Sequence, residues 1–305
     1  MSQKEFDLLE KYVHTGLTGD STLLVGIGDD AAVVAGESDV SYCFTTDATI
    51  EEVHFSRRYF STQDIARKVV AVNFSDLAAM GAAPRYLLSS IISPQHFDVG
   101  ELIDAIAVEV RRYGAELIGG NLSQGNALAI TATAIGVSPS KSNLLLRSGA
   151  RAGDLLYVTG PLGASSAGLR SFNSTDHRDL AMEQVHLNPK AKVAEGICLR
   201  EAGLKCAIDV SDGLVGDLSH VAKRSDVRAV IDSPPRREGS SLDDCLYGGE
   251  DFELIFAAPS SVDIKTIFLE SGLEAPICFG HVEAGKPEVV ATGIELSRSG
   301  FEHVF

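Results

Sequence analysis

Residues 62–81 read TQDIARKVVAVNFSDLAAMG, and this stretch decides how the first part of the chain folds. Its apolar residues recur at the spacing of one helix face: Ile65, Val69, Val72 and Ala79. The pattern predicts an amphipathic helix over residues 62–80, which Gly81 and Pro84 bring to an end. Because strand-like stretches precede and follow it, the helix indicates an α/β unit.

Asp76 continues the apolar series of this helix, so the pattern places a carboxylate on its buried face. An unpaired carboxylate in that position costs several kcal/mol of folding free energy. It therefore requires a buried arginine, a bound proton or a metal ion. A structural salt bridge and a metal ligand remain alternatives for Asp76 at this point.

Strand-like stretches alternate with helical ones along the rest of the chain. We expect strands over residues 42–46, 87–92, 117–121, 127–137, 155–159, 206–210 and 254–258, and further helices over residues 6–13, 99–113 and 212–223. A Ser/Pro/Lys segment at residues 138–143 is the best candidate for a linker. The alternation indicates a mixed α/β protein with two α/β domains, residues 1–138 and residues 147–305.

The composition excludes several classes of function. The 305 residues are 45% hydrophobic and 22% charged, an ordinary globular balance, and carry a formal net charge of −16. This charge repels nucleic acid and anionic membranes. No apolar stretch approaches the roughly 20 residues of a membrane-spanning helix, and no signal peptide opens the chain. The five scattered cysteines form no CxxC pair, which favours a reduced cytoplasmic protein.

Acidic residues gather at the ends of apolar stretches and in glycine turns. Taken alone, each would be explained by a helix cap or a turn. The set as a whole is harder to explain in that way, and strand ends are where ligands bind in open α/β proteins. Its members are Asp29, Asp30, Asp47, Asp76, Asp209, Asp212, Glu250 and Asp251.

Two of these carboxylates, Asp209 and Asp212, flank a turn between a predicted strand and a predicted helix, where the hydroxyl of Ser211 can join them. Hard oxygen ligands suit Mg²⁺, which keeps several waters and is completed by substrate phosphates. Bound cations would also offset the negative charge of a protein that holds a polyphosphate. The sequence has no Walker A loop, since its only Gly-Lys pair, Gly285-Lys286, is followed by proline. The prediction is a magnesium-dependent phosphoryl-transfer site without a P-loop.

Eight short motifs occur in order along the chain: Gly26–Asp30 (GIGDD), Thr45–Asp47 (TTD), Val53–Phe55 (VHF), Ala71–Gly81 (AVNFSDLAAMG), Ile118–Asn121 (IGGN), Arg147–Ala150 (RSGA), Asp209–Leu214 (DVSDGL) and Gly248–Asp251 (GGED). Together they resemble bacterial thiamine-monophosphate kinases, in the superfamily that includes aminoimidazole ribotide synthetase and selenophosphate synthetase. Each motif alone is weak, whereas the ordered set is specific. The resemblance runs from about Phe6 to the tail at Gly300–His303, nearly the whole chain.

The resemblance implies an ATP-dependent kinase that converts thiamine monophosphate to thiamine diphosphate. It implies a homodimer formed through the N-terminal domains, with the C-terminal domain covering the cleft. Several Mg²⁺ ions would be held by Asp30, Thr46, Asp47, Asp76, Asn121, Asp209 and Asp212, with Thr45 contributing nearby. ATP would be contacted by Gly120, Asn121, Arg147 and Ser211, and thiamine monophosphate by His54, Glu250 and Phe301.

Four positions depart from the family pattern. Asn121 stands where many relatives carry Asp, and its carbonyl oxygen keeps a metal-binding atom with one less negative charge. Ala164 stands where an Asp is expected, and Glu52 where Gly is common. Phe301 replaces Trp or Tyr and could stack on a substrate ring. Apart from the resemblance, His54 would be interpreted as a packed or surface histidine.

The acceptor implied by the resemblance is a phosphate, which is already ionised at neutral pH. Such a reaction needs no general base, and we expect none. Its difficulty is the approach of two anions, which Mg²⁺ and Arg147 would relieve. Two alternatives remain: another ATP-dependent synthetase of the superfamily, and a noncatalytic nucleotide- or thiamine-binding homologue. Branches that use a Cys near either terminus are disfavoured, because the first cysteine is Cys43 and the chain ends in Phe305.

Overall fold

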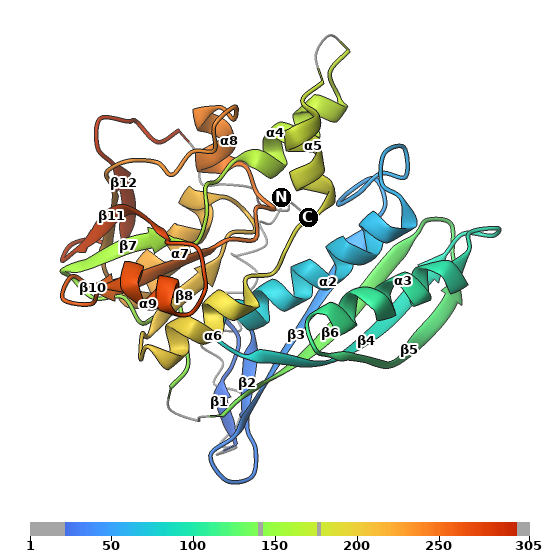
Figure 1. Cartoon of the computed structure of the whole chain (residues 1–305), viewed down its shortest axis with the longest axis horizontal. Coiled ribbons are helices and arrows are strands. Elements are labelled where there is room, and N and C mark those ends of the chain that lie inside the picture. The colour runs from blue at the N-terminus through green and yellow to red at the C-terminus, as the bar shows by residue number, and fades with distance from the viewer. Residues whose placement is uncertain (1–21, 140–142, 176–177, 298–305) are drawn as a thin grey trace, which may run out of the picture.

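The computed structural model describes residues 22–139, 143–175 and 178–297. They form two halves, each built on a six-stranded sheet (Figure 1). The first half contains β1 (Leu23–Val25), β2 (Ala32–Ala35), β3 (Ser41–Ile50), α2 (Thr62–Ala79), β4 (Ala83–Ser93), α3 (Val99–Arg112), β5 (Glu116–Gln124) and β6 (Ala129–Ser138). The expected helix over residues 6–13 lies outside the described residues.

The second half contains more helices than the first. Its elements are β7 (Asp154–Val158), α4 (Ala164–Phe172), α5 (Leu180–Leu187), α6 (Val193–Glu201), β8 (Cys206–Asp209), α7 (Leu214–Ser225), β9 (Arg228–Ile231), α8 (Leu242–Tyr247), β10 (Leu254–Pro259), α9 (Ile264–Glu270), β11 (Ile277–Glu283) and β12 (Glu288–Ala291). The mixed α/β class is confirmed. Strand pairing is mainly antiparallel, and the parallel pairs are β4–β5 and β9–β12.

The first sheet has the strand order β1-β2-β3-β6-β4-β5, and α2 and α3 lie against one of its faces (Figure 1). A capping box between Ser61 and Asp64 begins α2, and Gly81, with a φ of +67°, follows its end. Phe74 and Leu77 of α2 pack with Leu87 and other strand residues in the core of this half. The helix expected over residues 62–80 is therefore confirmed.

The second sheet has the strand order β12-β9-β11-β7-β10-β8. Its core includes Val158 of β7, Ile255 of β10, Ile208 of the edge strand β8 and Leu218 of α7. The end of α2 also reaches this half, because Ala78 and Ala79 pack in a cluster with residues of β8 and β10. Helix α2 therefore belongs to both halves, and residues on it can face the region where the halves meet. Among the helices of the described residues, none is both long enough and apolar enough to cross a membrane.

Candidate active site

Three carboxylates converge where the two halves of the chain meet. Oxygen atoms of Asp30, Asp76 and Asp209 lie within 4.8 Å of one another. Asp30 precedes β2, Asp76 lies in the last turn of α2 and Asp209 is the last residue of β8. The fold therefore brings three of the predicted metal ligands together from distant parts of the chain.

Strand β3 brings Asp47 and Thr45 to the same place. The hydroxyl of Thr45 donates to Oδ2 of Asp76 at 2.5 Å. Burial, and then the charges of Asp47 and Asp209, raise the pKa of Asp76 well above its ordinary value. Burial, and then Asp30, raise the pKa of Asp209 to about 8. Since these groups resist ionising together, a cation among their hard oxygen atoms would relieve the repulsion, and the donor set fits Mg²⁺.

Arg147 is paired with Asp30 and not with Asp76. Its Nη2 lies 2.7 Å from Oδ1 of Asp30, and its Nε lies 3.3 Å from Oδ2. No Lys or Arg in the described part of the chain forms an ion pair with Asp76, so the salt-bridge alternative has no support. Asp76 lies at the margin of the buried face of α2, and burial is the largest cause of its raised pKa. The residue as a whole keeps some exposed surface, while its neighbours Ser75 and Leu77 are fully buried.

Two hydrogen-bonding residues that the sequence did not single out hold this cluster in place. The hydroxyl of Ser75 donates to Oδ2 of Asp209 at 2.7 Å. The carboxylate of Asp217, in the first turn of α7, accepts three backbone N–H groups at 3.0–3.1 Å, those of residues 211–213. An acidic residue in the first turn of a helix is a recognisable signal, and here it fixes the loop that carries Ser211 and Asp212.

Three further predicted ligands take different positions. Asp212 is partly exposed on its loop and lies outside the group of three. The side chain of Thr46 points to the other face of the sheet, where its hydroxyl lies 3.1 Å from Oγ1 of Thr133. Asn121 lies on the edge strand β5, where it donates to Ser123 Oγ at 3.1 Å. Because β5 is three strand spacings from β3, roughly 14 Å, Asn121 does not reach the carboxylates of its own chain.

Gly120, next to Asn121, is required by its surroundings. Its φ is +155°, and a Cβ there would lie 1.8 Å from the carbonyl oxygen of Ser89. Only glycine allows this close approach of β5 to β4.

The residues predicted to contact the nucleotide lie in two separate places. Arg147 and Ser211 lie beside the carboxylate cluster, whereas Gly120 and Asn121 lie on the far strand of the first sheet.

The predicted substrate residues gather around Glu250. Its Oε1 lies 2.5 Å from Nζ of Lys68, a residue of α2 that was not predicted to have a role. His54 is held by the N–H of Ile50, which donates to its Nδ1 at 3.0 Å. His54 lies close enough for its charge to contribute to lowering the pKa of Glu250. Phe301 lies outside the described residues.

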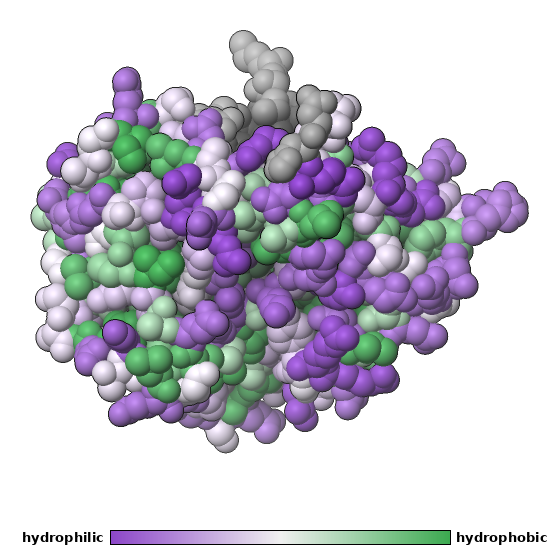
Figure 2. All heavy atoms as spheres, turned by 45° about the horizontal axis from the view of Figure 1, so that its top comes forward, coloured by the Kyte–Doolittle hydropathy of each residue, from purple (hydrophilic) through white to green (hydrophobic). Residues whose placement is uncertain are grey.

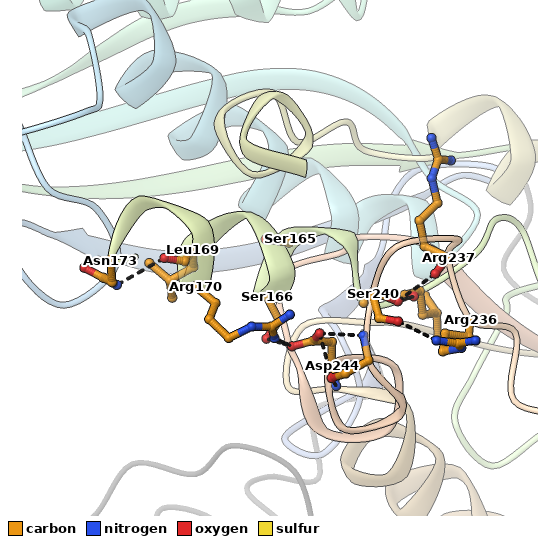
Figure 3. Close-up of polar contacts among 12 residues, drawn as sticks. Ser165, Ser166, Leu169, Arg170, Asn173, Arg236, Arg237, Ser240 and Asp244 are labelled. Carbon is orange, nitrogen blue, oxygen red and sulfur yellow. Dashed lines mark hydrogen bonds and ion pairs between the residues drawn. The ribbon is translucent and has the colours of Figure 1, made fainter. Parts of the chain in front are cut away.

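A cavity of about 380 Å³ opens beside Glu250. Its lining includes Ala164, Val185, Lys190, Arg237 and Glu250. Figure 3 shows the Arg237 side chain pointing away from the neighbouring polar cluster around Asp244. On the face seen in Figure 2, hydrophilic side chains form a band near the middle of the molecule.

Helix α4, whose first residue Ala164 lines this cavity, is held by an ion pair and by capping bonds. Asp244 forms an ion pair with Arg170 and accepts from Ser166, so it links α8 to α4 (Figure 3). Asp251 accepts from the N–H groups of Gly163 and Ser165 at 2.6 and 3.1 Å, which caps the start of α4. These bonds hold the start of α4 in place beside the cavity.

Comparison with known proteins identifies relatives over the whole chain. The family described as AIR synthase related protein matches in two parts, its N-terminal domain over residues 28–138 and its C-terminal domain over residues 151–292. The thiamine-monophosphate kinase of Haemophilus influenzae is 32% identical, over 99% of this chain and 98% of its own length. That of Bacillus subtilis is 33% identical, over 98% of this chain and 99% of its own length.

Solved structures agree with these relatives. The structure of AaThiL complexed with AMPPCP and TMP is 30% identical, with a TM-score of 0.81, over 98% of this chain and 97% of that one. Thiamine-monophosphate kinase from Stenotrophomonas maltophilia is 31% identical, with a TM-score of 0.76, over 96% and 98%. The hydrogenase maturation protein HypE in complex with ATP shares the fold at 19% identity and a TM-score of 0.67, over 98% of this chain and 92% of that one. The chain belongs to the thiamine-monophosphate kinase family, within the AIR synthase related proteins.

Proposed function

We propose that this chain transfers the γ-phosphoryl group of ATP to thiamine monophosphate, giving thiamine diphosphate and ADP. The observation that carries the proposal is the convergence of Asp30, Asp76 and Asp209 beside Arg147, since such a set is useful only with cations and a phosphate ligand. The complex of AaThiL with AMPPCP and TMP, which this chain matches over 98% of its length, supports the choice of both substrates.

Magnesium would be held by the carboxylates of Asp30, Asp47, Asp76 and Asp209, with Thr45 and Asp212 at the margin of the same site. When bound, Mg²⁺ supplies the positive charge that allows two phosphate groups to approach each other. Thr45 and Ser75 hold the oxygen atoms of Asp76 and Asp209 in fixed positions. Arg147, held by two bonds to Asp30, offers its remaining N–H groups to the nucleotide.

No general base is part of this proposal. The acceptor phosphate is ionised at neutral pH, so no proton has to leave it before it attacks. Positioning and charge neutralisation are then sufficient. A hydroxyl acceptor would need a general base to remove its proton, and loss of a positioned base costs about 10²–10⁴-fold in rate.

The proposal includes a homodimer of domains spanning residues 1–138, with residues 147–305 covering the cleft. The helix-free face of the first sheet exposes large apolar side chains: Tyr42, Phe44, Leu88 and Ile92. Several large exposed apolar side chains on one face of a sheet are typical of an interaction site. The side chains of Thr46 and Asn121 point to the same face, so their predicted contacts would be made within the dimer.

We also propose a reducing, cytoplasmic location. Burial raises the pKa of the Cys43, Cys206 and Cys245 thiols to about 12, so these thiols are unreactive packing groups. This is the use of cysteine that a reducing compartment allows.

Phosphorus NMR tests the activity directly. With ATP and Mg²⁺, thiamine monophosphate should yield thiamine diphosphate, and free thiamine should yield no thiamine monophosphate. EDTA should abolish turnover, and added Mg²⁺ should restore it. Full activity in EDTA would contradict the metal site. Phosphorylation of free thiamine, with no diphosphate formed from the monophosphate, would contradict the acceptor.

A further inference from the structure

Lys68 is buried in the middle of α2, where an ammonium group is costly unless it is paired. The residue is only 1% exposed. Its Nζ lies 2.5 Å from Oε1 of Glu250 and 5.6 Å from the centre of the Phe60 ring. The ring face adds a second favourable contact for the cation. Lys68 therefore reaches from the first half of the chain to a carboxylate of the second.

Glu250 lies between this lysine and the cavity. Its side chain keeps 29% of its surface exposed, and it lines the cavity of about 380 Å³. Its φ is +66°, an uncommon conformation for a residue other than glycine, and its N–H donates to Ser211 O at 2.9 Å. A Cβ at Gly249 would lie 2.1 Å from that same oxygen. The loop that carries Glu250 therefore packs closely against the loop of Ser211, which lies beside the carboxylate cluster.

The ionic state of Glu250 is set by its neighbours. Burial opposes its charge, but Lys68, His186 and His54 together hold its pKa below the ordinary value. Burial and Lys68 lower the pKa of His186 itself to about 4, so at neutral pH its ring is uncharged and Lys68 is the main cationic neighbour of Glu250. Its Nδ1 lies 3.0 Å from Ser165 Oγ and 3.8 Å from Glu250, too far for a hydrogen bond to the carboxylate.

Aromatic rings surround this pair and lower the local dielectric constant. Tyr59 and Phe172 stack with centroids 4.1 Å apart, and Phe60 meets the His186 ring edge-on at 5.5 Å. These rings come from both halves of the chain. In such surroundings the Lys68–Glu250 attraction is strong, and a carboxylate without its lysine would tend to take up a proton.

Helix α2 also sets the distance between this pair and the carboxylate cluster. Lys68 and Asp76 are eight residues apart on it, which corresponds to about 12 Å along the axis. Thiamine monophosphate in an extended conformation has a similar length, with its phosphate at one end and its aminopyrimidine ring at the other. With the phosphate at the carboxylate cluster, the ring reaches the cavity beside Glu250.

We infer that Lys68 is a positioning residue for acceptor selection: it keeps Glu250 a carboxylate, which then accepts a hydrogen bond from the exocyclic amino group of the acceptor's pyrimidine ring. This inference rests on the proposed function. A carboxylate accepts hydrogen bonds and cannot donate them. A ring that carries a carbonyl oxygen in place of the amino group is therefore rejected, since two acceptors would face each other in a buried site.

The test compares thiamine monophosphate with oxythiamine monophosphate, in which the amino group is replaced by oxygen. The wild-type protein should prefer thiamine monophosphate by at least about tenfold in kcat/KM, the value of one hydrogen bond to a charged group. Glu250→Gln should lose most of that preference, because an amide can donate as well as accept. Lys68→Met should raise the KM for thiamine monophosphate by about tenfold or more and leave the KM for ATP within about twofold.

The double variant Lys68→Met/Glu250→Gln should be no worse than Glu250→Gln alone, because the two residues act as a unit. Val69→Ala is the matched control: it removes packing from the same helix without touching Glu250, so it should lower Tm and leave both KM values and the preference unchanged. Lys68→Met that behaves like Val69→Ala would overturn the inference. So would an unchanged preference in Glu250→Gln, even if Lys68→Met fails to fold. A wild-type protein that does not phosphorylate thiamine monophosphate would instead overturn the proposed function.

Discussion

The hydroxyl of Ser75 donates to the Asp209 carboxylate at 2.7 Å, and this bond joins α2 of the first half to the end of β8 in the second. Both residues are buried, and Asp76, the next residue of α2, faces the same cluster. One turn of helix therefore both supplies a carboxylate and orients another. Side chains that orient metal ligands in this way typically affect metal affinity as well as geometry.

Ser75→Ala should weaken Mg²⁺ binding by about 10–100-fold, because Asp209 loses the donor that fixes its oxygen atoms. Activity at saturating Mg²⁺ should be less affected. A titration of activity with Mg²⁺ measures the shift. Ser138→Ala is the matched control, since Ser138 is a buried serine whose hydroxyl has no partner among the described residues. Equal Mg²⁺ requirements in the two variants would show that the Ser75 bond has no role in the site.

Asp76→Asn should lower activity by at least about 100-fold and raise the stability of the protein in EDTA by roughly 1–3 kcal/mol. The gain follows from the burial of Asp76 and then from the charges of Asp47, Asp209 and Asp30, which together raise its pKa well above the ordinary value. A melting curve and an assay on the same variant measure both effects. A loss of about 3–5 kcal/mol would indicate instead that a basic partner had been left unpaired.

The elements with strong periodicity could be predicted from the sequence, and their pairing could not. The apolar spacing in residues 62–80 predicted α2 with an error of one residue at its end. The ends of β8 and β10 were likewise close to their expected positions. In short strands the sequence does not distinguish antiparallel from parallel pairing, so the sheet topology was not predictable. Helices α5 and α6 were missed because no sustained apolar stripe distinguishes them.

The site was predictable only in part, for two physical reasons. Adjacent residues of a strand point to opposite faces, so Thr46 and Asp47 could not both face α2, and the alternation in the sequence already contained this information. Lys68 gave no such signal. A lysine in an amphipathic helix usually lies on the solvated face, and its partner Glu250 is 182 residues away. Long-range ion pairs of this kind depend on the tertiary structure.

Leu88→Asp should convert the protein to a monomer. Leu88 lies on the exposed, helix-free face of the first sheet, and a charge there would have to be buried in the proposed interface. Sedimentation at micromolar concentration should give about twice the 32.3 kDa chain mass for the wild type and the single mass for the variant.

The control for this measurement is Leu269→Asp. Leu269 is 53% exposed on α9 of the second half, away from the proposed interface, so this variant should remain a dimer. A wild-type protein that is active as a strict monomer would contradict the proposed assembly.

Stability should fall as the pH is lowered from 6.5 towards 4, in part because of His186. Burial, and then Lys68, lower the pKa of this imidazole from 6.5 to about 4. The unfolded chain therefore binds a proton below pH 6.5, whereas the folded chain binds it only near pH 4. The stability due to the neutral ring is present above pH 6.5 and is lost as the pH falls through this window, by up to about 3 kcal/mol. His186→Asn keeps a group able to bond Ser165 and cannot titrate, so its urea midpoint should change less between pH 7.5 and 4.5 than that of the wild type. Equal pH dependence in the two proteins would show that His186 titrates normally in the folded state.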